Sequence, residues 1–173
     1  MYTLADVRNE YNRLDQKLGI DTSNIRLTIS TRATRRYGFC RYKNNKPVEI
    51  NITDFILKCE HQFWDTIRHE YAHAYVKLLC PQEYHGHDKY WKAACSVVGC
   101  NPERVSYDDE AAKYSEQRRE TKYKYEVICK ECGQITRYCR KGEIVKIVEG
   151  TSERYRSCSC NHCGSHDFDL KYV

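Results

Sequence analysis

The chain has 173 residues, of which 40% are hydrophobic and 31% are charged, and its net charge is +5. This length and composition suit one modest domain with a small addition and exclude a single large core. No stretch approaches 18 consecutive apolar residues, which excludes a membrane-spanning helix. The first residues lack the basic and apolar regions of a secretory signal, so we expect an intracellular protein of the cytoplasm, nucleoid or nucleus.

The cysteine content and the charge distribution bear on metal binding and on nucleic-acid binding. Without an export signal, we expect the eleven cysteines to stay reduced and some of them to bind metal. The net charge is too small to establish nucleic-acid binding by itself. Most of the excess lies at the C-terminal end, where residues 111–173 contain 13 Lys and Arg against 9 Asp and Glu.

The first third of the chain predicts a helix followed by a sheet. Apolar residues recur at helical spacing over residues 4–18, with Thr3 as N-cap and Gly19 just past the end. Short β-rich runs follow, separated by turn residues. These runs cover residues 25–29, 37–42 and 48–52. The pattern predicts a small antiparallel meander.

Two further helices are expected in the middle of the chain. A helical pattern covers residues 54–80 with a break near Cys59, and Pro81 ends it. A third helix is expected over about residues 88–98, with Gly99 as its stop.

The last third of the chain differs in composition from the first two thirds. Residues 108–122 are charged and poor in aliphatic side chains, which is typical of a surface helix or a connector. From Tyr123 onward, short strand-like runs alternate with Cys and Gly. We therefore divide the chain into a domain over residues 1–107, a charged connector over residues 108–122, and a small all-β zinc ribbon with four cysteine ligands over residues 123–173.

The second helical segment contains the pattern HExxH, formed by His69, Glu70 and His73. Residues four apart share one face of a helix, so both imidazoles can bind one Zn²⁺. Glu70 flanks the metal without binding it. It can take a proton from zinc-activated water and pass it to a leaving amine.

A third metal ligand is expected from outside the helix, with the fourth position left open for water. The candidates in the loop after Pro81 are His85, His87 and Glu83. Periodicity alone leaves all three open. The alternative interpretation is a helix with two exposed histidines and an ordinary loop.

The order of these residues resembles the SprT-like zinc metallopeptidase family, to which the DNA–protein crosslink protease Spartan belongs. The resemblance rests on the HExxH segment, on His87 with Trp91 four residues later, and on Gly99 at the end of the next helix. It implies a zincin-like fold and His69, His73 and His87 as the ligands of a catalytic zinc. In this register His85 is a bystander.

The chain departs from the family pattern directly after its third histidine. The family usually has Gly there, and this chain has Asp88. We expect Asp88 to cap the third helix or to orient an imidazole, and capping is the favoured role.

Two CxxCG motifs, at residues 129–133 and 160–164, predict a second metal site. Thiolates of Cys129, Cys132, Cys160 and Cys163 would form a closed, tetrahedral structural zinc site. Each glycine lets the chain turn back so that backbone N–H groups face the sulfur. The competing ligands, which lack a CxxCG setting, are Cys139, Cys158 and His162. Such a small ribbon folds together with its metal.

Basic residues and tyrosines alternate around the ribbon, a pattern that suits phosphate contacts combined with base stacking. The candidate nucleic-acid contacts are Lys122, Tyr123, Lys124, Arg137, Tyr138, Arg140 and Lys141. Glutamates in the same segment leave open a mixed-charge surface without nucleic acid. Members of the SprT-like family often join such a zinc module to the protease domain, which favours nucleic acid as the partner, and the cations interleaved with tyrosines suit single-stranded DNA.

Together these features predict an α+β zincin-like domain with a small antiparallel sheet, followed by a zinc ribbon. We expect a monomeric, DNA-directed zinc metalloendopeptidase with two zinc ions per chain, acting on proteins crosslinked to DNA, the substrate class that the resemblance implies. One alternative is a nucleic-acid-binding regulatory zinc protein with a catalytically silent zincin domain. Another is a general peptidase indifferent to DNA. Glu70 favours an enzyme, because a silent site does not need the base.

Overall fold

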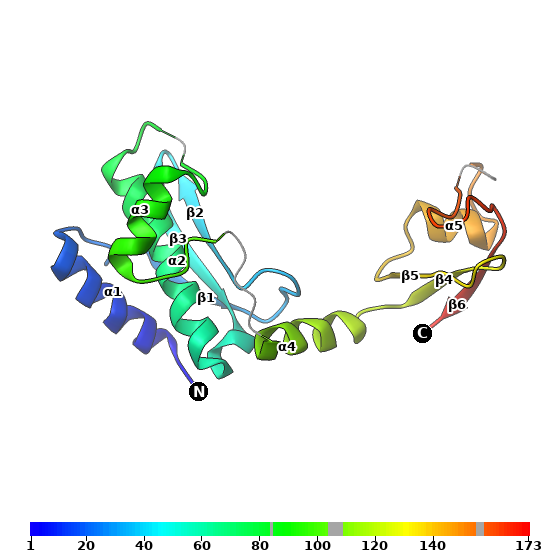
Figure 1. Cartoon of the computed structure of the whole chain (residues 1–173), viewed down its shortest axis with the longest axis horizontal. Coiled ribbons are helices and arrows are strands. Elements are labelled where there is room, and N and C mark those ends of the chain that lie inside the picture. Colours follow the sequence, from blue (N-terminus) through cyan, green and yellow to red (C-terminus); the bar gives the residue numbers. More distant parts are fainter. Residues whose placement is uncertain (84, 104–108, 155–157) are drawn as a thin grey trace. The chain divides into compact units, whose positions relative to one another are not determined.

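The computed structural model describes residues 1–83, 85–103, 109–154 and 158–173. The chain forms two compact units, Met1–Glu116 and Gln117–Val173, and each has its own three-stranded sheet (Figure 1). The architecture is mixed α+β. Among the helices described, none combines the length and the apolar character needed to cross a bilayer.

Helix α1 (Leu4–Leu18) begins and ends where the sequence predicts. The Thr3 hydroxyl accepts a hydrogen bond from the backbone N–H of Asp6, and the Asp6 carboxylate accepts one from the backbone N–H of Thr3. This reciprocal capping box satisfies two of the free donors at the helix start. Gly19 ends the helix in the left-handed region, at φ +69°, where a glycine is favoured.

The N-terminal sheet contains β1 (Arg26–Ser30), β2 (Gly38–Lys43) and β3 (Lys46–Thr53), in the order β1-β3-β2. Strands β2 and β3 are antiparallel, and both residues of their tight turn, Asn44 and Asn45, have positive φ. Strand β1 pairs with β3 in parallel.

The predicted antiparallel meander is therefore wrong in the position and direction of β1. Strand β3 is the most buried of the three strands and takes the centre of the sheet, where both of its edges are paired. The chain after β1 passes β3 and forms the far edge strand β2 before it returns.

The long helical segment is divided as the sequence predicts. A short 3-10 helix, η1 (Asp54–Lys58), ends at Cys59, and α2 (Glu60–Leu79) follows and stops before Pro81. Helix α2 packs against β2, β3 and α3. The HExxH residues therefore lie on a helix that the sheet and a second helix hold in place.

Helix α3 (Lys89–Val98) starts at an aspartate cap. The Asp88 carboxylate accepts hydrogen bonds from the backbone N–H groups of Tyr90 and Trp91, which confirms its predicted capping role. Gly99, at φ +79°, ends the helix as predicted.

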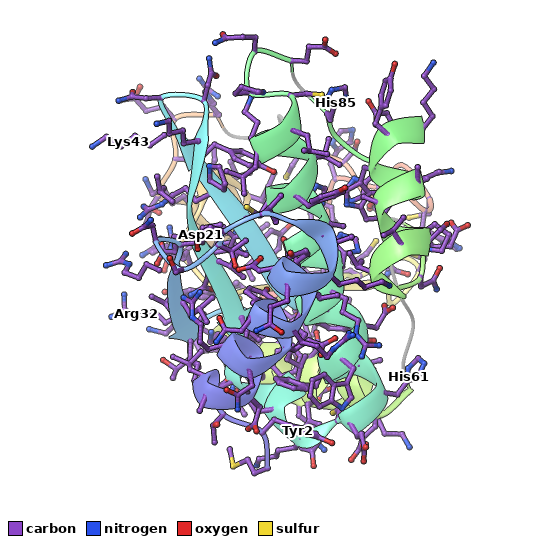
Figure 2. The ribbon with its side chains drawn as sticks, turned by 90° about the vertical axis from the view of Figure 1, so that its left-hand side faces the viewer. Tyr2, Asp21, Arg32, Lys43, His61 and His85 are labelled. Atoms are coloured by element: carbon purple, nitrogen blue, oxygen red, sulfur yellow. The ribbon has the colours of Figure 1, made fainter. Side chains whose placement is uncertain are left out.

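The core of the N-terminal unit joins α1, α2, α3 and the sheet. Its largest fully buried side chains include Trp91, Tyr11, Tyr71, Phe63 and Leu14. Figure 2 shows these elements with their side chains, with His61 and His85 toward opposite ends of α2.

The predicted connector contains helix α4 (Asp109–Glu120). Its first half belongs to the N-terminal unit: the Lys58 ammonium lies 5.6 Å from the Tyr114 ring centre, and the Ser115 hydroxyl donates to the Thr34 carbonyl. The two units divide inside this helix, so the N-terminal unit extends past the predicted domain end at residue 107.

The C-terminal unit has an antiparallel sheet with the order β5-β4-β6. Its elements are β4 (Tyr125–Cys129), β5 (Ile135–Tyr138), α5 (Glu143–Glu149) and β6 (Phe168–Tyr172). The prediction of an all-β unit is wrong, because α5 packs on β4 and β6. Gly142 and Gly150 flank this helix, and it buries Val145 and Ile147.

Candidate functional site

Three histidines from two parts of the N-terminal unit converge. His69 and His73 lie one turn apart on α2, and His87 lies in the loop before α3. Their ligand atoms all lie within 4.8 Å of one another, and His69 Nε2 is 3.2 Å from His87 Nε2. Nitrogen ligands of a tetrahedral zinc are about 3.3 Å apart. We call these three residues the histidine cluster. Their spacing therefore fits a zinc ion.

Trp91 on α3 packs against all three imidazoles. Its ring centre lies 4.7 Å from that of His69, 5.2 Å from that of His73 and 4.5 Å from that of His87. Burial, helped by the neighbouring imidazoles, lowers the pKa of His69 to about 4 and that of His73 to about 3. Both rings are therefore neutral near pH 7, and the neutral imidazole is the form that binds metal.

Glu70 lies next to the histidine cluster on α2 and is only 6% exposed. It packs closely against strand β2: a Cβ atom on Gly38 would lie 2.9 Å from Glu70 Cγ and 3.0 Å from Glu70 Oε1. The glycine at the start of β2 thus makes room for the carboxylate, a role that the sequence did not reveal. Burial raises the pKa of Glu70 to about 8, and a hydrogen bond from the backbone N–H of Cys40 opposes the rise.

The other two candidates for the third ligand lie outside the histidine cluster. His85 Nδ1 is 2.6 Å from an Asp88 carboxylate oxygen, and His85 Nε2 is 3.2 Å from a Glu83 carboxylate oxygen. Asp88 thus orients an imidazole in addition to capping α3. His87 as a metal ligand stays a prediction, and His87 lies where that prediction requires.

Four cysteines converge in the C-terminal unit. Cys129 Sγ is 3.5 Å from Cys163 Sγ, and Cys132 Sγ is 3.6 Å from Cys160 Sγ. All four sulfurs lie within 4.8 Å of one another. Thiolates of a tetrahedral zinc, at about 2.3 Å from the metal, are about 3.8 Å apart. These residues, here the cysteine cluster, therefore also fit a metal ion.

The two CxxCG motifs form the tight turns expected of them. The backbone N–H of Gly133 donates to the carbonyl of Cys129, and that of Gly164 donates to the carbonyl of Cys160. Both glycines have positive φ, at +71° and +77°. Backbone N–H groups facing the sulfur lower the pKa of Cys129 to about 6 and also lower that of Cys160. These turns favour the thiolates of Cys129 and Cys160, the form that binds metal, whereas burial and the neighbouring cysteines raise the pKa of Cys132 and of Cys163.

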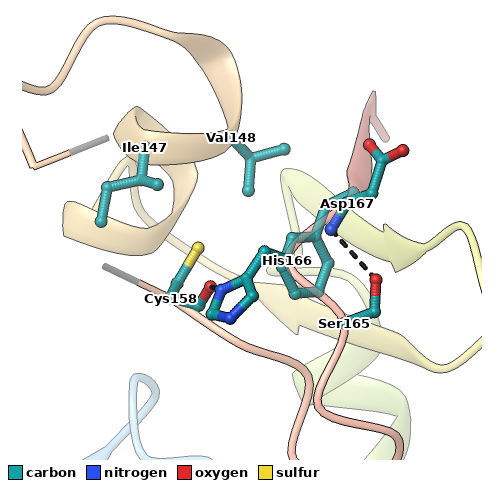
Figure 3. A pocket seen from close by; sticks show the side chains of 7 residues that line it. Ile147, Val148, Cys158, Ser165, His166 and Asp167 are labelled. Atoms are coloured by element: carbon teal, nitrogen blue, oxygen red, sulfur yellow. Dashed lines mark hydrogen bonds between the residues drawn. The ribbon is translucent and has the colours of Figure 1, made fainter. Parts of the chain in front are cut away.

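The competing cysteines lie elsewhere. Cys158 lines a hollow together with Ile147, Val148 and His166 (Figure 3). Cys139 is exposed. Within the described parts of the chain, the histidine cluster and the cysteine cluster are the only convergent groups of potential metal ligands.

The predicted nucleic-acid contacts lie near the start of β4 and the end of β5. These two ends meet at one end of the C-terminal sheet, where Tyr125 of β4 pairs with Tyr138 of β5. Arg137 and Lys141 form ion pairs with Glu126 and Glu149. The remaining candidates are exposed or half-buried: Lys122, Tyr123, Lys124, Tyr138 and Arg140.

The model of the SprT-like family matches residues 4–111, more than half of the chain. The chain belongs to the SprT-like family. The match includes the histidine cluster, Glu70 and Trp91, and it ends before the cysteine cluster, which the structure alone brings together. No curated protein matches the chain.

Proposed function

We propose that this SprT-like chain is a zinc-dependent endopeptidase directed to nucleic acid, with a zincin-like N-terminal unit and a zinc ribbon as its C-terminal unit. The observation that carries the proposal is the convergence of three imidazoles beside the buried side chain of Glu70. Three nitrogen ligands leave a fourth position open, which is typical of a catalytic zinc site.

The mechanism divides the work between the metal and the protein. Zinc, when bound by the histidine cluster, would act as a Lewis acid that activates water and polarises the scissile carbonyl. The positive charge of a bound zinc would favour the ionised form of Glu70, which accepts the proton of the attacking water and donates it to the leaving amine. Strand β2 supports this role, since Gly38 leaves room for the carboxylate and the Cys40 N–H donates to it. Trp91 covers one side of the imidazoles and restricts their motion.

The C-terminal unit, in this proposal, recruits single-stranded DNA. The cysteine cluster holds a structural zinc, and the basic side chains at the end of β4 and β5 attract phosphate while the tyrosines stack on bases. The support is the basic excess of residues 111–173 and the gathering of Lys124, Tyr138 and Arg140 at one end of the sheet. Proteins crosslinked to DNA are the proposed substrates.

The test compares wild type with Glu70→Gln in cleavage of an unfolded protein and in self-cleavage, each with and without single-stranded DNA. The amide keeps the size of the side chain but cannot accept the proton, so we expect the rate to fall by about 10²–10⁴. Zinc content and DNA binding should not change. Glu116→Gln, at an exposed position of α4, is the matched control and should cleave like wild type.

Two other outcomes would change the assignment. A zinc-loaded, DNA-binding wild type that cleaves neither substrate would contradict the enzyme and leave the regulatory protein. Cleavage that depends on Glu70 but is not stimulated by DNA would indicate a general peptidase.

A further inference from the structure

The loop between α2 and α3, which carries His87, is held at its start by side chains from other elements. The Lys77 ammonium donates to the carbonyls of Pro81 and Glu83, at 2.8 Å and 2.9 Å. The Asn45 amide, in the turn between β2 and β3, donates to the Gln82 side chain at 3.4 Å. These contacts end at residue 83, four residues before His87, so they do not by themselves fix its imidazole.

His85 holds the second part of this loop. Its side chain is only 7% exposed, and its ring centre lies 4.9 Å from that of Tyr90. His85 Nδ1 forms a hydrogen bond with the Asp88 carboxylate, whereas His85 Nε2 lies 3.2 Å from a Glu83 carboxylate oxygen without a hydrogen bond. The ring nitrogens of His85 are not among the converging ligand atoms of the histidine cluster, and the burial of its side chain indicates a structural role in the loop. Figure 2 shows His85 in this loop.

Asp88 connects His85 to the start of α3, which carries Trp91 against the histidine cluster. One carboxylate oxygen lies 2.6 Å from His85 Nδ1, and the other accepts from the backbone N–H groups of Tyr90 and Trp91. The His85–Asp88 bond therefore closes a short ring that includes the backbone of His87, and Asp88 ties this ring to the first turn of α3. Gly86, directly before His87, is the residue type with the most backbone freedom, so the ring restricts a position that is otherwise loosely defined.

We infer that His85 is a positioning residue that sets the imidazole of His87 in the histidine cluster through Asp88. The inference rests on the proposed function, in that the histidine cluster binds zinc. It replaces the bystander role that the family resemblance implies for His85. Zinc affinity at the histidine cluster then depends on His85, whereas zinc affinity at the cysteine cluster does not.

The test measures zinc affinity at both clusters of the full chain by competition with a chelator, using Co²⁺ absorption to tell nitrogen from sulfur ligands. His85→Phe keeps an aromatic ring against Tyr90 but cannot donate to Asp88. We expect affinity at the histidine cluster to fall by about 10–100-fold, as for other residues that orient metal ligands. His85→Asn, whose amide can donate, should recover most of it. His61→Phe, at an exposed position near the start of α2, is the matched control and should leave both affinities unchanged.

Asp88→Ser provides an independent variant, since serine still caps a helix but offers no carboxylate to His85. We expect the same loss as in His85→Phe. Wild-type affinity at the histidine cluster in either folded variant would overturn the inference, and an equal loss at both clusters would also overturn it. Absence of zinc from the histidine cluster of the wild type would instead refute the proposed function.

Discussion

The two units are stabilised in different ways. The N-terminal unit buries large rings and aliphatic chains from three helices and a sheet, including Trp91 and Phe63. Among the described residues of the C-terminal unit, the buried aliphatic side chains are Val127, Val145 and Ile147, and the other buried apolar groups are cysteines. A core of this size does not stabilise a fold without a metal or a disulfide. If both clusters bind metal, the comparison predicts that the histidine cluster is built on a stable scaffold, whereas the C-terminal unit needs the metal of the cysteine cluster in order to fold.

Metal removal tests this difference with the largest expected effect. A structural zinc contributes about 10–16 kcal/mol to folding, so a chelator should unfold the C-terminal unit. Hydrogen exchange should show loss of protection in β4 and β6, while the amides of α2 stay protected. Strands β4 and β6 that remain protected in zinc-free protein would contradict the comparison.

A substitution at Gly38 tests how closely the N-terminal scaffold is fitted to its site. Gly38→Ala places a methyl group 2.9 Å from Glu70 Cγ, and we expect a loss of about 1–3 kcal/mol in the free energy of unfolding of this unit. Cleavage should also slow, because the carboxylate must move. Denaturant unfolding measures the first effect. Gly142→Ala, where nothing lies within 4 Å of the new Cβ, should change the stability much less.

Glu10 tests the contact between α1 and α2. Its carboxylate accepts hydrogen bonds from Arg13 and from Arg68 of α2, and these bonds lower its pKa below the ordinary 4.5. A lowered pKa stabilises the fold above pH 4.5, and this contribution is lost as the pH falls through the folded-state pKa. Glu10→Gln should cost about 1–2 kcal/mol at pH 7 and less at pH 3. Unfolding free energies at both pH values measure this, and a loss independent of pH would contradict it.

The sequence predicts what local chemistry determines. The ends of α1 and α3 follow from Thr3 and Gly19 and from Asp88 and Gly99, and each cap involves residues within one turn. The spacing of His69 and His73 likewise follows from the helical repeat. These features need no knowledge of the rest of the fold.

What the sequence does not predict depends on contacts between distant segments. The β-rich run of β1 predicts a strand but not its parallel partner β3. The contact of Gly38 with Glu70 exists only because β2 becomes the edge strand beside α2. The apolar run of α5 is short enough to read as a strand, since a segment of seven residues shows too little periodicity to decide.

Elemental analysis of the purified full chain tests the central claim most directly, because the two clusters share no residue. We predict two zinc ions per chain in the wild type. One should remain in Cys129→Ser combined with Cys163→Ser, and one should remain in His69→Ala. A wild type with a single zinc, retained in the cysteine variant and lost in His69→Ala, would contradict the account of the C-terminal unit as a zinc-dependent fold.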